Sequence, residues 1–190
     1  MFVDVALPKG NEKEFVEIAK KLGTEALLFL YDKKIGDFET KEIKIYKGLI
    51  NSKNQQKITF NIGERFSVEQ KHQKYLYGFE TLERKDSMHQ RRSGMNQVIA
   101  KLIKQKEKTY IIDFEKFIER QDKETILGRL NQNLMLARKY ELDVAICSFA
   151  TKPENLRPQM ELKSLISSFG FQQIAKKSVT TLHEKLEEKE

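Results

Sequence analysis

The stretch FVDVALPKGNEKEFVEIAKKLGTEALLFL, residues 2–30, decides the fold of this chain. Residues 2–7 and 26–30 are short apolar runs that predict buried strands. Between them Phe15, Ile18, Ala19 and Leu22 recur at the spacing of one helical face. A strand, a helix and a second strand within 30 residues form a βαβ unit, which predicts parallel pairing and a right-handed crossover.

The alternation of strands and helices continues along the rest of the chain. The pattern predicts further strands at 43–50, 58–62, 75–79, 110–114 and 144–148. It predicts helices at 67–72 with Ser67 as the cap, at 96–105, from Asp122 as the cap to 140, and from 158 to 169, followed by two short helical pieces. Seven expected strands, most of them followed by helices, favour a parallel barrel or a doubly wound sheet. We expect one β/α domain over residues 1–183 and an acidic C-terminal tail over 184–190.

Composition limits the class of protein. The 190 residues are enough for one domain with a well-buried core, since 39% of them are hydrophobic. The single cysteine, Cys147, excludes an internal disulfide and a zinc site with several cysteines. No apolar stretch reaches the length of a membrane span. We therefore expect a cytoplasmic protein that is not inserted in a membrane.

Positive charge is concentrated in one window. Eight basic residues and only two acids fall between Arg84 and Lys108, so this window holds six of the seven net positive charges of the chain. The basic residues are Arg84, Lys85, Arg91, Arg92, Lys101, Lys104, Lys106 and Lys108, with His89 as a further candidate. A local basic patch of this kind is typical of a nucleic-acid partner.

Arg91 and Arg92 are the strongest candidates for contact with phosphate. Their forked guanidinium groups suit the geometry of phosphate oxygens, which lysine does not match. Gly94 allows a tight turn, and Ser93 or Asn96 can cap the helix that follows. A helix N-terminus beside two arginines is a ready site for an anion, although a solvated loop and an ordinary helix start would need the same residues.

The remaining candidates each have a structural reading beside the functional one. Lys101 and Lys104 lie on the polar face of the helix at 96–105, where charge also serves solvation. Arg157 follows the strand at 144–148, on the side where barrels carry their working loops, but it can also bridge to an acid at the rim. Arg138 and Lys139 end a helix, where cations complement the dipole.

Several segments together resemble the archaeal RNase P protein component 3, the family of the eukaryotic thirty-kilodalton subunit of RNase P and RNase MRP. The matching stretches are Phe2-Val-Asp-Val5, Arg92-Ser-Gly-Met-Asn-Gln-Val-Ile-Ala-Lys101, Leu127-Gly-Arg-Leu-Asn-Gln-Asn-Leu-Met-Leu-Ala-Arg-Lys-Tyr140, and Cys147-Ser-Phe-Ala150 followed by Asn155-Leu-Arg157. No single stretch is diagnostic, but their order and spacing cover almost the whole chain. The connections between Tyr31 and Lys57 are shorter than the family pattern.

This resemblance implies a TIM-barrel-like parallel β/α barrel with about seven strands, of the polymerase and histidinol phosphatase-like kind. It also implies a subunit of a ribonucleoprotein in which the RNA, with Mg²⁺, removes the 5′ leader of precursor tRNA. The expected partners are the RNase P RNA and a small ferredoxin-like protein subunit, in a heterodimer or heterotetramer, with precursor tRNA contacted indirectly. One candidate for the protein interface is an exposed apolar surface near Phe114, Phe117 and Ile118.

We expect no catalytic residue and no metal site in the protein itself. Metal-dependent phosphoesterases on related barrels carry a His-x-His pair at the first strand, where this chain has Val3-Asp-Val5. Asp4 is expected to hydrogen-bond within the barrel, and Asp113 and Glu115 stand alone, too few for a polynuclear site. Two alternatives stay open, a divergent metal-dependent phosphoesterase and an RNA-binding scaffold outside RNase P.

Overall fold

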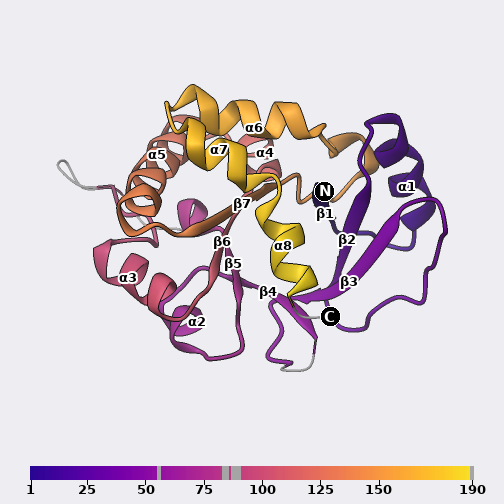
Figure 1. Cartoon of the computed structure of the whole chain (residues 1–190), viewed down its shortest axis with the longest axis horizontal. Coiled ribbons are helices and arrows are strands. Elements are labelled where there is room, and N and C mark those ends of the chain that lie inside the picture. Colours follow the sequence, from indigo (N-terminus) through magenta and orange to yellow (C-terminus); the bar gives the residue numbers. More distant parts are fainter. Residues whose placement is uncertain (55–56, 83–85, 87–90, 189–190) are drawn as a thin grey trace.

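The computed structural model describes residues 1–54, 57–82, 86 and 91–188. These residues form a seven-stranded sheet in which each strand pairs in parallel with the next in sequence. The strands are Val3–Ala6 (β1), Ala26–Tyr31 (β2), Lys44–Ile50 (β3), Ile58–Ile62 (β4), Tyr75–Tyr77 (β5), Thr109–Asp113 (β6) and Asp143–Cys147 (β7). The sheet curls into a nearly closed barrel (Figure 1), so the predicted α/β barrel is confirmed.

The seam between β1 and β7 is closed by the segment that follows β7. Ala150 pairs in parallel with Ala6, donates its N–H to Val5 O over 3.1 Å and accepts the Leu7 N–H over 2.9 Å. The fully buried carboxylate of Asp4 bridges the rest of the seam, because it accepts the N–H and the hydroxyl of Ser148, both at 2.6 Å. The expectation that Asp4 hydrogen-bonds within the barrel is confirmed.

Helices cover most of the outer surface of the barrel (Figure 1). They are Glu12–Lys21 (α1), Arg65–Glu69 (α2), Gln97–Gln105 (α3), Glu115–Glu119 (α4), Lys123–Tyr140 (α5), Gln159–Ser168 (α6), Gln172–Ser178 (α7) and Thr181–Glu187 (α8), with 3-10 turns at Phe79–Thr81 (η1) and Pro153–Asn155 (η2). The connections from β2 to β3 and from β3 to β4 carry no helix within the described residues. The wall there is covered by the segment after β2, whose Phe38 packs edge-on against Phe29.

One helix start and one helix cap differ from the sequence-based expectation. The helix expected from Ser67 begins at Arg65 and ends at Glu69, because Val68 is fully buried and donates its N–H to Glu64 O. Asp122 does precede α5 as expected, but its side chain makes no cap hydrogen bond. Its carboxylate instead pairs with the guanidinium of Arg120.

The interior of the barrel is filled by side chains from every strand and by one helix. Five of the fifteen buried residues in this cluster are aromatic, and Phe60 and Tyr75 stack with ring centroids 4.8 Å apart. Leu182 and Leu186 of α8 belong to this cluster, so α8 closes the end of the barrel at which the strands begin. The boundary expected between residues 183 and 184 therefore falls inside a packed helix.

The barrel thus has two distinct ends. We call the end at which the strands finish the carboxyl end, and the end at which they begin the amino end. α8 covers the amino end, where Tyr75 donates its hydroxyl to Lys185 O over 3.0 Å. The carboxyl end carries the loops after β4, β5, β6 and β7, which is where barrels place their functional residues.

Candidate nucleic-acid interface

The loop that carries Arg91 and Arg92 follows β5 and η1 at the carboxyl end, and it is anchored by a buried arginine of α5. Arg129, with a side chain only 4% exposed, donates to Glu80 O over 3.0 Å and to Leu82 O over 2.9 Å. Its Nε and Nη2 both reach Asp86 Oδ1, at 3.0 and 2.8 Å. Asp86 Oδ1 also accepts the Arg92 N–H at 2.7 Å. One carboxylate therefore connects the loop to α5.

Burial would raise the pKa of Asp86, but the hydrogen bonds from Arg129 and from the Arg92 N–H outweigh that effect and hold the pKa below its ordinary value. Asp86 therefore stays ionised, which keeps the charge of Arg129 paired. An unpaired charge at this depth would be costly.

A second buried network lies under the same loop. The hydroxyl of Ser93 is 2.7 Å from Asn133 Oδ1 and 3.2 Å from Phe79 O. Asn133, which is fully buried, donates to the carboxyl group of Glu80 over 3.2 Å. Burial raises the pKa of Glu80 to about 7. Ser93 therefore fixes the loop rather than facing solvent.

The cationic groups themselves are exposed, although the backbone beneath them is fixed. Both Arg91 and Arg92 are exposed. The guanidinium of Arg91 lies over Gly128 of α5, where an added Cβ would sit 2.2 Å from Nη1. A fixed backbone with exposed guanidinium groups suits the binding of anions, since little ordering remains to be done on association.

The start of α3 lies directly after this loop. The side chain of Asn96 accepts the Ile99 N–H at 3.0 Å, so the predicted Asn96 cap is confirmed. Gly94 approaches Leu82 and Gly63 closely, and an added Cβ would lie 2.5 Å from Leu82 Cδ1. A larger residue at this turn would push the loop off the barrel.

The structure places the helix-borne candidates elsewhere. α3 and α5 run from the carboxyl end back to the amino end, so Lys104, Arg138 and Lys139 lie near the amino end. The ammonium of Lys104 donates to Glu141 O over 2.7 Å. Arg138 lies over the ring of Phe171 at 5.1 Å. Lys139 lies over the ring of Tyr140 at 5.5 Å.

Of the other candidates, Lys101 is exposed midway along α3. Arg157 lies at the carboxyl end, but its guanidinium is engaged locally. It donates to Glu154 O and Leu156 O at 2.8 and 2.9 Å and lies 3.8 Å from Glu161. The predicted contacts at Arg84, Lys85 and His89 fall outside the described residues.

Lys108 shows that the basic window is not one continuous patch. Its side chain is 1% exposed, and its ammonium donates to Gln70 O and Gln73 O at 2.5 Å and to Ser67 O at 3.4 Å. Burial and the neighbouring charges of Lys106 and Lys74 lower the pKa of Lys108 to about 8. This cation holds the end of α2 and is not available to a ligand.

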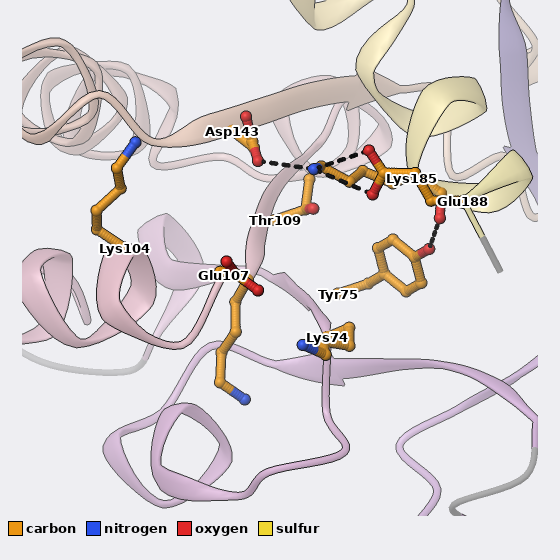
Figure 2. Close-up of a pocket in the computed structure, with 9 residues that line it drawn as sticks. Lys74, Tyr75, Lys104, Glu107, Thr109, Asp143, Lys185 and Glu188 are labelled. Atoms are coloured by element: carbon orange, nitrogen blue, oxygen red, sulfur yellow. Dashed lines mark hydrogen bonds and ion pairs between the residues drawn. The ribbon is translucent and has the colours of Figure 1, made fainter.

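Two cavities lie at opposite ends of the barrel. The amino-end cavity has a volume of about 540 Å³ and is shown in Figure 2. Three of its lining residues form ion pairs, because Lys185 lies 3.2 Å from Asp143 and 3.4 Å from Glu188. These ion pairs tie α8 to β7, which is a structural role.

The second cavity, of about 470 Å³, opens at the carboxyl end, and we call it the mouth pocket. It is lined by Ile62, Glu64, Tyr77, Gly78, Thr81, Leu82, Asp113 and Lys116. Burial raises the pKa of Asp113 to about 8. Within the described residues no group of three or more His, Cys, Asp and Glu side chains is placed to hold a metal ion, and the expectation of no protein-bound metal stays an expectation.

Glu115 has a structural role. One of its oxygens accepts the N–H and the hydroxyl of Thr151 and the amide of Asn155, at 2.7–3.0 Å. It joins the segment after β6 to the segment after β7.

The apolar surface expected near Phe114, Phe117 and Ile118 is not formed as predicted. Phe117 is 9% exposed and belongs to the core, and Phe114 packs against the same cluster. Only Ile118 is substantially exposed, at 38%. The first two side chains are needed to fill the space between α4 and α5.

The anchoring residues Arg129, Asn133 and Asp86 were not identified from the sequence. A signal was present, because Arg129 and Asn133 share the buried face of α5 with Ile126, Leu130 and Leu134. A charged and an amide residue on an apolar face require buried partners. Arg129 pairs with Asp86, and Asn133 pairs with Ser93 and Glu80. Each of these partners is 40 or more residues away in the sequence, so the spacing of residues along the chain does not identify them.

No family model matches the chain, and no curated protein matches it either. A protein chain in a structure described as the cryo-EM structure of archaeal Ribonuclease P with mature tRNA superposes with a TM-score of 0.75 and 19% identity, covering 96% of this chain and 88% of that chain. The crystal structure of an uncharacterized protein matches with a TM-score of 0.54 and 7% identity, covering 96% and 73%. At these identities the likeness shows a shared fold, which agrees with the family resemblance of the sequence. None of the described helices is both long and apolar enough to cross a membrane.

Proposed function

We propose that this chain is a protein subunit of ribonuclease P that binds the catalytic RNA and supports removal of the 5′ leader from precursor tRNA. The observation that carries the proposal is the shared fold with a chain of an archaeal ribonuclease P over 96% of this chain. The anchored loop with exposed Arg91 and Arg92 supports it, because guanidinium groups pair well with phosphate.

In this proposal the protein has no catalytic residue. The RNA breaks the phosphodiester bond with Mg²⁺, and the protein offsets phosphate repulsion. The partners are the RNase P RNA and a small ferredoxin-like protein subunit, in a heterodimer or heterotetramer. Precursor tRNA is contacted through the complex, and the complex is cytoplasmic. RNA contact is assigned first to Arg91, Arg92 and Arg157 at the carboxyl end, and then to Lys101 on α3.

Reconstitution tests the assembly. The RNA subunit, the small partner and this chain are combined, and leader cleavage is measured against Mg²⁺ concentration. We expect cleavage at a lower Mg²⁺ concentration than the RNA alone requires. Leader cleavage by the lone chain would support the phosphoesterase alternative, and RNA binding without any effect on cleavage would support a scaffold outside RNase P.

A matched pair of double variants tests the RNA surface. Arg91→Ala with Arg92→Ala removes two charges at the carboxyl end, and Arg138→Ala with Lys139→Ala removes two at the amino end. Each phosphate contact contributes roughly 0.7–0.9 to the slope of log K against log salt. We expect the first variant to reduce that slope by about 1.5 in a filter-binding titration, while the second leaves it near the wild-type value. Equal slopes for both variants would contradict the assignment.

A further inference from the structure

The floor of the mouth pocket is a buried carboxyl group with almost no partner. Asp113, the last residue of β6, is 5% exposed. Its Oδ1 accepts the Lys116 N–H at 3.3 Å, and no other hydrogen bond reaches this carboxyl group within the described part of the chain. Buried polar groups in proteins are nearly always hydrogen-bonded. A carboxyl group that lines an open cavity and keeps free acceptor sites indicates that a donor enters from outside.

A cation stands beside this acid. Lys116 lines the same pocket and is half-buried, and its ammonium donates to Glu119 over 3.0 Å. An ammonium carries three N–H donors, so others remain for a ligand. The pocket is therefore lined by both the carboxyl group of Asp113 and the cationic side chain of Lys116.

We propose that the mouth pocket binds a guanine base. The Watson–Crick edge of guanine presents the N1–H and N2–H donors next to the O6 acceptor, which matches the two oxygens of Asp113 and the ammonium of Lys116. The other three bases do not place two adjacent donors beside an acceptor. Ile62 and Leu82 provide apolar walls for the ring. The volume of about 470 Å³ falls within the roughly 300–1,000 Å³ usual for small-ligand sites.

Phosphate does not fit this pocket. The carboxyl groups of Glu64 and Asp113 line it and present acceptor oxygens, while Lys116 is the one cationic side chain among the lining residues. The loop that carries the exposed arginines borders the pocket, because Leu82 lines the pocket, packs against Gly94 of the loop and accepts a hydrogen bond from Arg129. A nucleotide whose phosphate meets Arg92 can direct an unstacked base into the pocket, which is a usual mode of single-strand RNA recognition. The RNA origin of the guanine rests on the proposed function, whereas recognition of the base does not.

Binding of guanine requires Asp113 to release its proton. Burial holds Asp113 protonated near neutral pH, with Lys116 opposing this effect and Glu115 and Glu80 reinforcing it. Two donors from guanine require the ionised carboxylate, so binding expels the proton. Affinity for guanine should rise up to roughly tenfold per pH unit and level off above pH 8. Tyr77 and Glu64 are the other titratable groups, besides Asp113 and Lys116, among the residues that line the cavity.

Nucleotides test the pocket directly on the purified chain. GMP, IMP and AMP carry the same phosphate, and IMP lacks only the 2-amino group of guanine. Equilibrium dialysis at pH 6, 7 and 8 should give GMP binding about tenfold tighter than IMP and AMP, with a GMP to AMP ratio that rises with pH. Equal binding of the three, or no binding of GMP, would overturn the proposal.

Single-residue variants test whether the selectivity for GMP depends on Asp113 and Lys116. Asp113→Asn keeps the shape and the bond from the Lys116 N–H but replaces one acceptor by a donor, so the preference for GMP and its pH dependence should both disappear. Asp143→Asn makes the same change of charge at the amino end and should bind GMP like wild type. Lys116→Met should weaken GMP while preserving the ratio of GMP to IMP. Thermal melts show that each variant is folded, and retained GMP selectivity in a folded Asp113→Asn variant would reject the assignment.

Two RNA octamers, identical except that one position is guanine in the first and adenine in the second, test whether the guanine belongs to RNA or to a free nucleotide. A guanine preference that is lost in Asp113→Asn supports a base within RNA. GMP selectivity without an octamer preference assigns the pocket to free guanine nucleotides instead. Failure of both octamers to bind while GMP binds would contradict the proposed function and leave the guanine pocket standing.

Discussion

Asp4 is the side chain that bridges the seam of the barrel, beside the backbone pairing of Ala150. Its carboxylate accepts two bonds from Ser148 across the seam and one from the Val5 N–H at 2.8 Å. Ser148 in turn accepts the Arg157 N–H over 2.9 Å, so the loop that carries Arg157 depends on the same group. A polar group at the seam thus supports both closure of the barrel and the geometry of its carboxyl end.

This arrangement predicts a pH dependence of stability. Burial raises the pKa of Asp4 from 3.8 to about 6 against the opposing effect of its hydrogen bonds. The folded state therefore holds a proton that the unfolded state releases, and the free energy of unfolding falls as pH rises from about 4 to about 6. Relative to Asp4→Asn, whose amide does not ionise, wild type should lose roughly 3 kcal/mol over this window.

Urea denaturation at pH steps of 0.5 measures the difference between the two proteins. Asp32→Asn, at an exposed position, is the control and should follow wild type at each pH. If the free energy of unfolding depends on pH in the same way for wild type and Asp4→Asn, ionisation of Asp4 costs nothing extra in the native state. That result would contradict the claim that burial raises the pKa of Asp4.

Among the elements, α5 organises the candidate interface. It anchors the loop through Arg129 and Asn133, and it packs on α3 and on η1. The loop order therefore depends on a helix that lies more than 30 residues further along the chain. Exposure of the loop to protease reports on this dependence, since trypsin cleaves after arginine.

Replacing the anchor should loosen the loop. Arg129→Met leaves Asp86 and the carbonyls of Glu80 and Leu82 without their donor, which should lower the free energy of unfolding by about 3 kcal/mol. Tryptic cleavage after Arg91 and Arg92 should accelerate. Arg138→Met, on the exposed face of the same helix, should cost less than about 1 kcal/mol and leave cleavage unchanged. Similar stability and cleavage for both variants would contradict the anchoring role.

The elements were largely predictable, because the strands and long helices carry strong periodicity. β7 is an apolar run after its first residue, Asp143, and α3 has both a regular apolar face and an asparagine cap. α4 was not predicted, because Glu115–Glu119 is little more than one helical turn and directly follows a strand. The start of α2 was misplaced, since burial of Val68 counted for more than the preference of Ser67 for a cap.

At the scale of the whole molecule, the charge pattern was the least predictable feature. The described part of the basic window runs from the loop at Arg91 through the whole of α3 to Lys108, just before β6, so it extends from the carboxyl end of the barrel to the amino end. Lys108 is buried and Lys104 caps the end of α5, which a count of charges along the sequence does not reveal. Arg91 and Arg92 of the loop are exposed. The mouth pocket was missed because its polar residues come from three separate strand ends.

Closure of the amino end by α8 gives the last prediction, at the scale of the whole molecule. Leu186, in the segment expected to be an acidic tail, is 2% exposed within the barrel interior. Leu186→Ala should lower the free energy of unfolding by about 3 kcal/mol through lost burial and the cavity left behind. Because the interior cluster joins α8 to every strand, the barrel should still unfold in one transition, with far-ultraviolet circular dichroism and tyrosine fluorescence following the same urea curve. Met160→Ala, at a side chain 67% exposed, is the control and should leave stability within about 0.5 kcal/mol of wild type. Loss of α8 at lower urea than the strands would mean that the helix is an appendage and that the barrel closes without it.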